Sequence, residues 1–136
     1  MKVIAIDIDS SKVILFALEQ IDDGTLTNIT GNFRSITVKD DYNNEEIREF
    51  QATIHSFFDN INPNKIGVIK RMTKGKFSAS PVSFKLEGLI QCYKNCDVEF
   101  VSPSTLTAYY RKNTFCVVTQ YNYQTNSARL AQYLIS

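Results

Sequence analysis

The fold is decided by residues 66 to 93, IGVIKRMTKGKFSASPVSFKLEGLIQCY. This stretch begins with a short β-branched run, Ile66 to Ile69, which is typical of a strand buried on both faces. It ends with residues whose helical spacing predicts one apolar helix face: Val82, Leu86, Leu89, Ile90 and Tyr93. A buried strand, a loop and a helix therefore follow one another within a single unit.

The loop between this strand and this helix is strongly basic. Its basic residues are Lys70, Arg71, Lys74 and Lys76. Gly75 lies among them, and its missing side chain permits a tight or left-handed turn. Ser80-Pro81 then predicts the start of the helix, because a serine hydroxyl accepts from free helix N–H groups and proline suits the first helical position.

The N-terminal part of the chain predicts antiparallel strands. Two apolar runs, residues 3–8 and 13–18, are separated by the turn signal of residues 9–12, which indicates a hairpin. Because strand side chains alternate between faces, Asp7 and Asp9 are expected on the same face. Residues 29–38 predict a third strand, and the three strands together form a meander.

The order of elements predicts the fold class. The remaining expected elements are a helix over residues 47–61, a strand over 98–101, a helix over 106–110 after Ser102-Pro103, a strand-like segment at 114–119 and a terminal helix over 126–135. Strands followed by alternating helices and strands predict a three-layer α/β fold. We expect one domain over residues 1–136, with a mixed five-stranded sheet flanked by helices.

The composition is that of a soluble globular protein. Of 136 residues, 43% are hydrophobic and 21% are charged. Asp7 and Asp9 interrupt the first apolar run before it reaches the length of a signal-peptide core or a membrane span. The cysteines number three, and an odd count is typical of reduced thiols. We therefore expect a cytoplasmic protein without a membrane partner.

The charge is distributed unevenly along the chain. Residues 1–60 hold five Lys and Arg against eleven Asp and Glu, a net charge of −6. The remaining residues hold ten against three, a net charge of +7. The basic half favours a polyanionic partner, and the alternative is a solvated cationic face.

Several segments resemble a known group of proteins. IAIDID, which contains Asp7, and the segments KGKF and FKLEGLIQ are similar to RuvC-type members of the ribonuclease H-like superfamily. The segments VIKRMTKGKF, SFKLEGLIQ and VEFVSP resemble a small bacterial family of unknown function with a RuvC-like fold more closely. The resemblance implies a ribonuclease H-like fold.

The resemblance also defines the expected acidic site. In RuvC-like nucleases, an aspartate ending the first strand, a glutamate ending the fourth and acids on the last helix hold two divalent ions. Asp7 matches the first acid, but Lys70 stands where the glutamate is expected, and residues 123–136 contain no Asp or Glu. Since a cation there repels metal ions, Lys70 is expected to pair with Asp7 in place of a metal.

The first functional hypothesis is a catalytically degenerate RuvC-like protein that binds nucleic acid or another polyanion. Its phosphate contacts would come from Lys70, Arg71, Lys74, Lys76 and, on the following helix, Lys85. Phe77 would stack on an unpaired base or ring, and its alternative role is a core residue that closes the loop.

The second hypothesis is a metal-dependent endonuclease. Asp7 and Asp9 would be its catalytic acids, with Asp7 as a metal ligand and Glu87 as a displaced third acid. This is the only hypothesis that implies a cofactor, Mg²⁺ or Mn²⁺, because hard cations need oxygen ligands. The alternative interpretation of Asp7 and Asp9 is a polar strand end and a turn residue.

The third hypothesis is a protein-interaction domain, either a homodimer or a partner of another protein. Aromatic residues are favoured at interface cores, and the C-terminal third contains Tyr109, Tyr110, Tyr121, Tyr123 and Tyr133. Tyrosines that cap an α/β core would produce the same sequence pattern.

Overall fold

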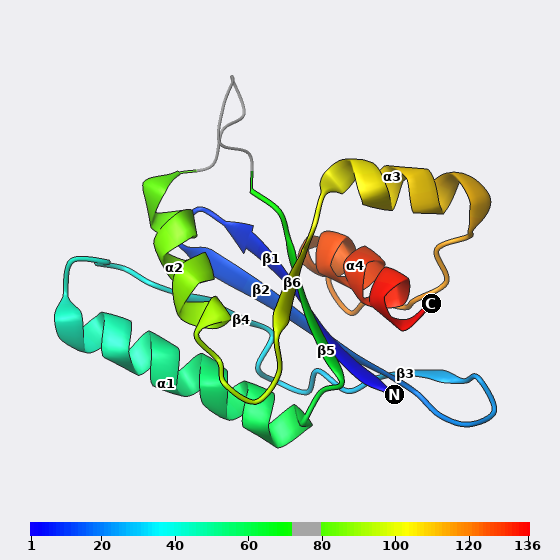
Figure 1. The fold of residues 1–136 in the computed structure, drawn as a ribbon, viewed down its shortest axis with the longest axis horizontal. Coiled ribbons are helices and arrows are strands. Elements are labelled where there is room, and N and C mark those ends of the chain that lie inside the picture. The colour runs from blue at the N-terminus through cyan, green and yellow to red at the C-terminus, as the bar shows by residue number, and fades with distance from the viewer. Residues whose placement is uncertain (72–79) are drawn as a thin grey trace.

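A mixed sheet forms the middle layer of the computed structural model, which describes residues 1–71 and 80–136 (Figure 1). Its strands are β1 (Lys2–Asp9), β2 (Lys12–Gln20), β3 (Leu26–Asn28), β4 (Ser35–Thr37), β5 (Lys65–Ile69) and β6 (Val98–Val101). They lie in the order β3, β2, β1, β5, β6, and β4 also pairs with β2. β1, β5 and β6 run parallel, whereas β2 is antiparallel to β1, β3 and β4.

The hairpin of β1 and β2 sets the two faces of the sheet. Its register runs from Lys2 opposite Glu19 to Asp9 opposite Lys12. Side chains alternate along each strand, so the two faces of β1 carry different residues. The residues Ile4, Ile6 and Ile8 enter one buried cluster, and Val3 and Ala5 enter the other. Asp7 and Asp9 thus follow on from Val3 and Ala5, at the carboxyl end of the strand.

Helices cover both faces of the sheet (Figure 1). They are α1 (Asn44–Ile61), α2 (Pro81–Gln91), α3 (Pro103–Lys112), the short 3₁₀ helix η1 (Asn122–Gln124) and α4 (Thr125–Ile135). α1 and α2 bury Phe50, Ile54 and Leu86 against one face. α4 buries Leu130 and Leu134 against the other face, and α3 packs against α4. The expected three layers are therefore present.

The terminal helix α4 lies unusually close to β5. A Cβ atom added to Gly67 would lie 2.7 Å from Cδ1 of Leu134, so the missing side chain makes room for the helix. Nζ of Lys65 donates to the backbone oxygen of Leu134 at 3.0 Å, which fastens the end of the helix to the start of the strand. The start of α4 is thereby held near the carboxyl ends of β1 and β5.

The sheet differs from the expected five strands. In the described residues it has six, because the predicted strand 29–38 is reduced to the short strand β4 and another short strand, β3, precedes it. Between them the N–H of Thr30 donates to Oδ1 of Asn28, and Gly31 adopts a φ of 70°. A residue in the left-handed region cannot continue a strand, so the chain turns there.

The strand-like segment 114–119 is also not a strand in the structure. The N–H of Cys116 donates to Oε1 of Gln132 at 3.0 Å, and Nε2 of Gln132 donates to the backbone oxygen of Thr114 at 2.9 Å. The backbone of this segment is therefore satisfied by a side chain of α4 instead of a neighbouring strand.

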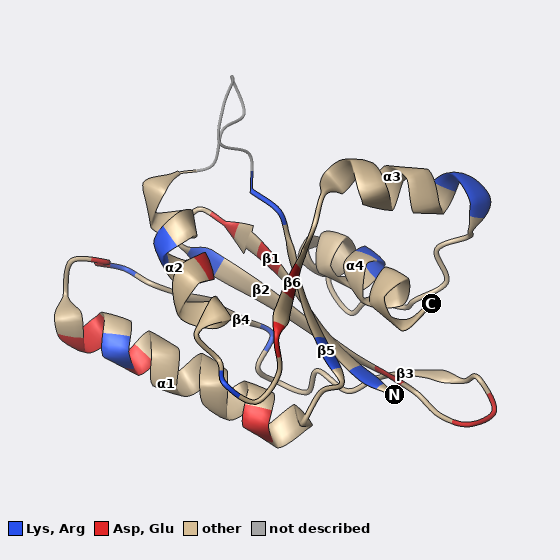
Figure 2. Cartoon of the chain, in the orientation of Figure 1, with Lys and Arg blue, Asp and Glu red and all other residues tan. Residues whose placement is uncertain are grey.

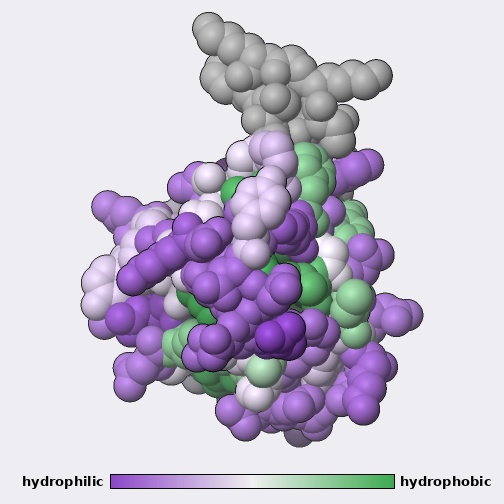
Figure 3. Space-filling view, turned by 90° about the vertical axis from the view of Figure 1, so that its left-hand side faces the viewer, coloured by the Kyte–Doolittle hydropathy of each residue, from purple (hydrophilic) through white to green (hydrophobic). Residues whose placement is uncertain are grey.

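The charged residues follow the asymmetry of the sequence. Figure 2 marks acidic residues along α1 and basic residues at the end of α3 and just beyond β5. Figure 3 shows that the face carrying α1 and α2 is largely hydrophilic, with smaller apolar areas among the polar side chains. Among the described residues, no helix is both long enough and apolar enough to span a membrane.

Candidate functional site

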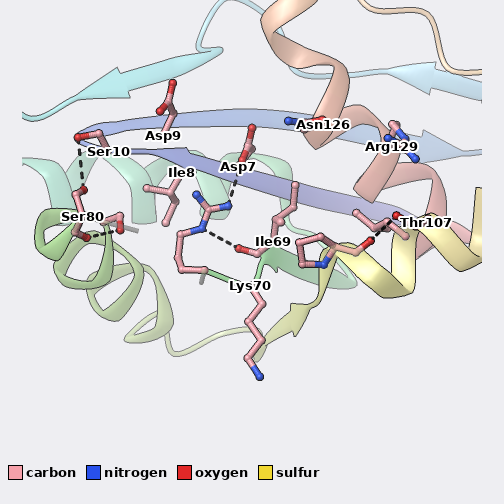
Figure 4. A pocket seen from close by; sticks show the side chains of 14 residues that line it. Asp7, Ile8, Asp9, Ser10, Ile69, Lys70, Ser80, Thr107, Asn126 and Arg129 are labelled. Carbon is pink, nitrogen blue, oxygen red and sulfur yellow. Dashed lines mark hydrogen bonds and ion pairs between the residues drawn. The ribbon is translucent and has the colours of Figure 1, made fainter. Parts of the chain in front are cut away.

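A cleft of about 590 Å³ opens beyond the carboxyl ends of β1 and β5 (Figure 4). Its walls are formed by the ends of these strands and by the first turns of α2, α3 and α4, which contribute Ser83, Leu106 and Asn126. In open α/β sheets, ligands bind outside the carboxyl ends of the strands. The cleft is therefore the candidate functional site.

Two carboxylates predicted from the sequence line this cleft. Asp7 and Asp9 lie on the same side of β1, as Figure 4 shows and as strand periodicity predicts. The Asp7 side chain is only 14% exposed, whereas Asp9 at the end of the strand is exposed. The two acids therefore meet different environments, and Asp7 needs a compensating partner more than Asp9 does.

The partner of Asp7 is Arg71, which follows β5. Nη2 of Arg71 lies 3.3 Å from Oδ1 of Asp7, and the Arg71 side chain is 15% exposed. Nε of Arg71 also donates to the backbone oxygen of Ile69 at 3.2 Å. These two bonds orient the guanidinium, so that a positive charge is fixed at the end of the central strands.

The expectation that Lys70 pairs with Asp7 is wrong. The N–H of Lys70 donates to the backbone oxygen of Val101 at 2.8 Å, which continues the strand pairing by one residue. Figure 4 shows the Lys70 side chain pointing away from Asp7. Because side chains alternate along an extended chain, position 71 shares the face of Ile69 and Asp7, and position 70 does not.

Arg71 also acts on Glu87 of α2, the acid that the nuclease hypothesis adds to the site. Burial raises the pKa of the Glu87 carboxyl, and the positive charge of Arg71 lowers it by a smaller amount. Oε2 of Glu87 is buried and has no hydrogen-bond partner among the described residues. Glu87 does not line the cleft, so it does not join Asp7 and Asp9 in one acidic group.

Three helices begin at the cleft. Ser80 precedes Pro81 at the start of α2, Pro103 begins α3, and Asn126 is the second residue of α4. The Ser80 side chain makes no capping bond to its helix, and its Oγ lies 3.5 Å from Oγ of Ser10 across the cleft. Helix N-termini present free N–H groups and a partial positive charge. They add to the attraction of the cleft for anions.

α4 contributes Asn126 and Arg129 to the cleft, and no sequence pattern had predicted either of them. They are three positions apart and so share one face of the helix. The guanidinium of Arg129 lies 4.7 Å from the centre of the Tyr110 ring, and the Tyr110 hydroxyl donates to the Arg129 backbone oxygen at 2.6 Å. Burial strongly raises the pKa of that hydroxyl, which keeps it a donor. The sequence signal that could have indicated Arg129 is that the terminal helix contains no acidic residue and one basic residue.

Four further predicted residues are not placed in the cleft. Nζ of Lys85 donates to the backbone oxygen of Asp41 at 2.7 Å and pairs with its Oδ2 at 3.1 Å. Lys85 is thus engaged on the outer side of α2 and does not line the cleft. The other residues, Lys74, Lys76 and Phe77, lie outside the described residues.

The residues of the cleft do not fit a pair of divalent metal ions. Two-metal phosphodiester hydrolysis needs several anionic oxygen ligands. Within residues 1–71 and 80–136, no three His, Cys, Asp or Glu side chains are grouped so that they could hold a metal ion. Of the two carboxylates in the cleft, Asp7 is already engaged by a guanidinium.

The C-terminal tyrosines fall into two groups. Tyr109 contacts Tyr110 and Tyr133 edge to face, with ring centres 4.8 Å and 5.4 Å apart. These rings pack α3 on α4 and so help to cap the core. Tyr121 and Tyr123 form a separate pair that is 40% and 39% exposed.

Comparison with protein families finds a match over almost the whole chain. The profile of a family described as "Protein of unknown function (DUF3010)" matches residues 1–133. No curated protein matches the sequence.

Solved structures with a similar fold include Holliday junction resolvases. Thermus thermophilus RuvC is 10% identical with a TM-score of 0.75, over 96% of this chain and 91% of that one. RuvC from the same organism, in complex with Holliday junction substrate, is 10% identical with a TM-score of 0.65, over 96% and 90% of the two chains. The yeast mitochondrial Holliday junction resolvase Ydc2 is 13% identical with a TM-score of 0.56, over 96% and 66%. These similarities confirm the ribonuclease H-like fold and the resemblance to RuvC-like proteins of unknown function.

Proposed function

This chain belongs to the DUF3010 family of unknown function, and we propose that it is a catalytically degenerate RuvC-like protein that binds nucleic acid in the cleft. The observation that carries the proposal is the ion pair of Arg71 and Asp7, which puts a fixed guanidinium at the end of β1. In RuvC-like nucleases, the corresponding aspartate holds a divalent ion. Arg71 replaces the charge of such an ion but supplies neither a bound water nor a Lewis acid.

The charge balance of the cleft supports an anionic ligand. Lys70, Arg71 and Arg129 line it, against the two carboxylates of Asp7 and Asp9. Since Arg71 neutralises Asp7, the described lining residues leave Arg129 and the exposed Lys70, whose side chain points away from Asp7, against the single charge of Asp9. The starts of α2, α3 and α4 add partial positive charge. A phosphate group would therefore meet a net attraction.

The donors of Arg71 support phosphate as that anion. A guanidinium has five N–H groups, and the bonds to Asp7 and Ile69 use two of them. The remaining donors suit the oxygens of a phosphate, which arginine binds with a fixed planar geometry. The cleft volume of about 590 Å³ lies in the ordinary range of ligand sites, so it can take a nucleotide-sized group.

The basic segment after β5 remains part of this proposal on sequence grounds. Arg71 and Ser80, which flank the segment, both line the cleft. From the sequence alone, Lys74 and Lys76 are proposed to contribute further phosphate contacts, and Phe77 is proposed to stack on an unpaired base. The fold similarity to RuvC in complex with Holliday junction substrate adds a second, independent reason to test branched DNA.

The alternative function, a metal-dependent endonuclease, finds less support. It requires Glu87 to join Asp7 and Asp9, and Glu87 does not line the cleft. It also requires Asp7 to exchange Arg71 for a metal ion. We therefore derive no hydrolytic step, and we assign Asp7 the role of orienting Arg71 toward a phosphate.

The test is fluorescence anisotropy of labelled single-stranded, duplex and four-way DNA, and of RNA, over a range of salt concentrations. Each neutralised duplex phosphate contributes about 0.9 to the slope of log affinity against log salt. Combining Lys70→Gln with Arg129→Gln should therefore lower the slope by about two and weaken binding to every sequence. Lys94→Gln, which removes one exposed charge beyond the far end of α2, is the matched control.

The outcomes separate the hypotheses. A slope that falls in the double variant and not in Lys94→Gln supports phosphate binding in the cleft. Binding that Lys94→Gln weakens about half as much as the double variant, in proportion to the charges removed, would indicate only general attraction to a positive surface. No binding to any nucleic acid at low salt would reject the proposal and leave the protein-interaction hypothesis.

A further inference from the structure

An exposed pair of stacked tyrosines stands between β2 and α4. The rings of Tyr121 and Tyr123 are nearly parallel, with centres 5.5 Å apart and planes inclined by 11°. Nζ of Lys12 lies 4.7 Å from the centre of the Tyr123 ring, and Cζ of Arg34 lies 4.8 Å from that of Tyr121. We call these four residues the tyrosine platform.

The tyrosine platform is held in a defined position. Tyr121 directly precedes the 3₁₀ helix η1, Tyr123 is its middle residue, and its last residue, Gln124, is fully buried. Oε1 of Gln124 accepts from the N–H of Tyr121 at 3.2 Å, which fixes the approach of the chain to the helix. A rigid aromatic surface costs little conformational entropy when a ligand binds to it.

The tyrosine platform adjoins the cleft. Lys12 lies directly opposite Asp9 in the register of β1 and β2, and Asp9 lines the cleft. Asn126, which also lines the cleft, follows Tyr123 by three residues at the start of α4. A ligand that extends from the cleft toward β2 would therefore reach the tyrosine platform.

The two cations of the tyrosine platform contact aromatic rings. Among residues 1–71 and 80–136, neither Lys12 nor Arg34 forms an ion pair. Cation–π contacts at exposed sites are weak, which leaves the charge of these cations available to an anion. Tyr121 and Tyr123 remain 40% and 39% exposed beside these two cations, so part of each ring is accessible to a ligand.

Exposed aromatic rings beside a cationic track are the features that bind single-stranded nucleic acid. We propose that the tyrosine platform binds unpaired nucleotides of a nucleic acid whose phosphates continue into the cleft. The bases stack on or against the rings of Tyr121 and Tyr123, and Lys12 and Arg34 contact the phosphates. This inference rests on the proposed function and adds a preference, because the bases of an intact duplex are already stacked and paired.

The test compares a blunt duplex with the same duplex carrying an unpaired tail that contains 2-aminopurine. The full-length wild-type protein should bind the tailed duplex more tightly and change the 2-aminopurine fluorescence through stacking. Loss of one base–aromatic contact is worth about 5- to 150-fold in affinity. Tyr121→Leu combined with Tyr123→Leu should weaken the tailed duplex by such a factor and leave the blunt duplex within about twofold.

Two further variants distinguish loss of a specific contact from a general loss of structure. Tyr121→Phe combined with Tyr123→Phe keeps both rings and should keep the preference for the tail, with an unchanged thermal unfolding curve. Lys12→Gln combined with Arg34→Gln keeps both tyrosines and should lower the salt slope for the tailed duplex by about 1.4, since each single-strand phosphate contributes about 0.7, and should leave the slope for the blunt duplex unchanged. If the leucine variant does not fold, this glutamine variant decides the question.

The outcomes are distinct from those of the proposed function. Wild-type protein that binds no nucleic acid would overturn both. Wild-type protein that binds blunt and tailed duplexes equally would overturn this inference alone. Leucine or glutamine variants that weaken both duplexes to the same extent would also overturn it, because they would reveal a general effect instead of contact with unpaired nucleotides.

Discussion

Nη2 of Arg71 lies 3.3 Å from Oδ1 of Asp7, although the residues are 64 positions apart in the chain. Parallel pairing of β1 with β5 brings them together, because it aligns Ile6 with Val68 and so places the carboxyl ends of the strands side by side. The ion pair thus joins the two central strands at the cleft. The Arg71 side chain is the group on which both the stability and the proposed chemistry of the site depend.

Arg71→Gln is predicted to lower the free energy of unfolding by about 1–3 kcal/mol, because it leaves the carboxylate of Asp7 without its charged partner in a mostly shielded position. It should also raise the pKa of Glu87 further, since the charge of Arg71 lowers that pKa. Urea denaturation measures the first effect, and carboxyl carbon chemical shifts against pH measure the second.

Lys70→Gln is the matched control for this change. It removes the neighbouring positive charge, whose side chain points away from Asp7 (Figure 4). Its unfolding free energy should stay within about 0.5 kcal/mol of the wild type, as for most surface substitutions. Equal losses in both variants would contradict a specific pair of Arg71 with Asp7.

Metal ions should have little effect on this protein. Addition of Mg²⁺ or Mn²⁺ is predicted to produce no strand scission of bound DNA and no shift of the unfolding temperature, because among the described residues the cleft offers only Asp9 as an unengaged carboxylate. Gel assays of labelled duplex and four-way DNA measure the first, and thermal unfolding measures the second. Cleavage that needs a divalent metal and disappears in Asp7→Ala would instead establish the endonuclease hypothesis.

Much of the fold follows from local patterns in the sequence. Helical spacing located α1 and α2, and Ser102-Pro103 located the start of α3, where the Ser102 hydroxyl accepts from the N–H of Thr105. The strand expected over residues 29–38 is interrupted at Gly31. The positive φ of Gly31 and the hydrogen bond from the N–H of Thr30 to the side chain of Asn28 turn the chain there. Thr30-Gly31-Asn32 is itself a turn signal, so this tripeptide favours a turn over a continuous strand.

The site was predictable only in part. Strand periodicity placed Asp7 and Asp9 together, and the same periodicity, applied beyond Ile69, would have selected Arg71 over Lys70 as the partner of Asp7. Arg129 could not be predicted from the sequence, because its position in the cleft depends on how α4 crosses the sheet. That crossing is set by packing between distant residues, such as Leu134 against Gly67.

Glu87 is predicted to make stability depend on pH. Its pKa in the folded protein is raised above the ordinary 4.5, chiefly by burial. Between pH 4.5 and this raised pKa, the folded state holds more protons than the unfolded state. Stability should therefore fall as the pH rises through that window, and it should stay at the lower level above it. Glu87→Gln removes this loss of stability. The free energy of unfolding of the variant should therefore increase relative to that of the wild type as the pH rises.

Urea denaturation at a series of pH values from 4 to 7 measures the Glu87 effect as the difference between variant and wild type. Glu49→Gln, at an exposed position on α1, corrects for the loss of one negative charge. A difference that is constant over this range, or that matches that of Glu49→Gln, would refute the role of Glu87 burial.

The last prediction concerns the close approach of α4 to β5. Gly67→Ala puts a Cβ atom 2.7 Å from Cδ1 of Leu134, which is buried and has little room to move. Overpacking of this kind costs about 1–3 kcal/mol, and a shift of α4 would carry Arg129 away from Asp7 and weaken nucleic-acid binding. Gly88→Ala meets nothing within 4 Å on the exposed side of α2 and should instead stabilise by about 0.5–1 kcal/mol. Similar unfolding curves and affinities for the two variants would show that the position of α4 does not control the cleft.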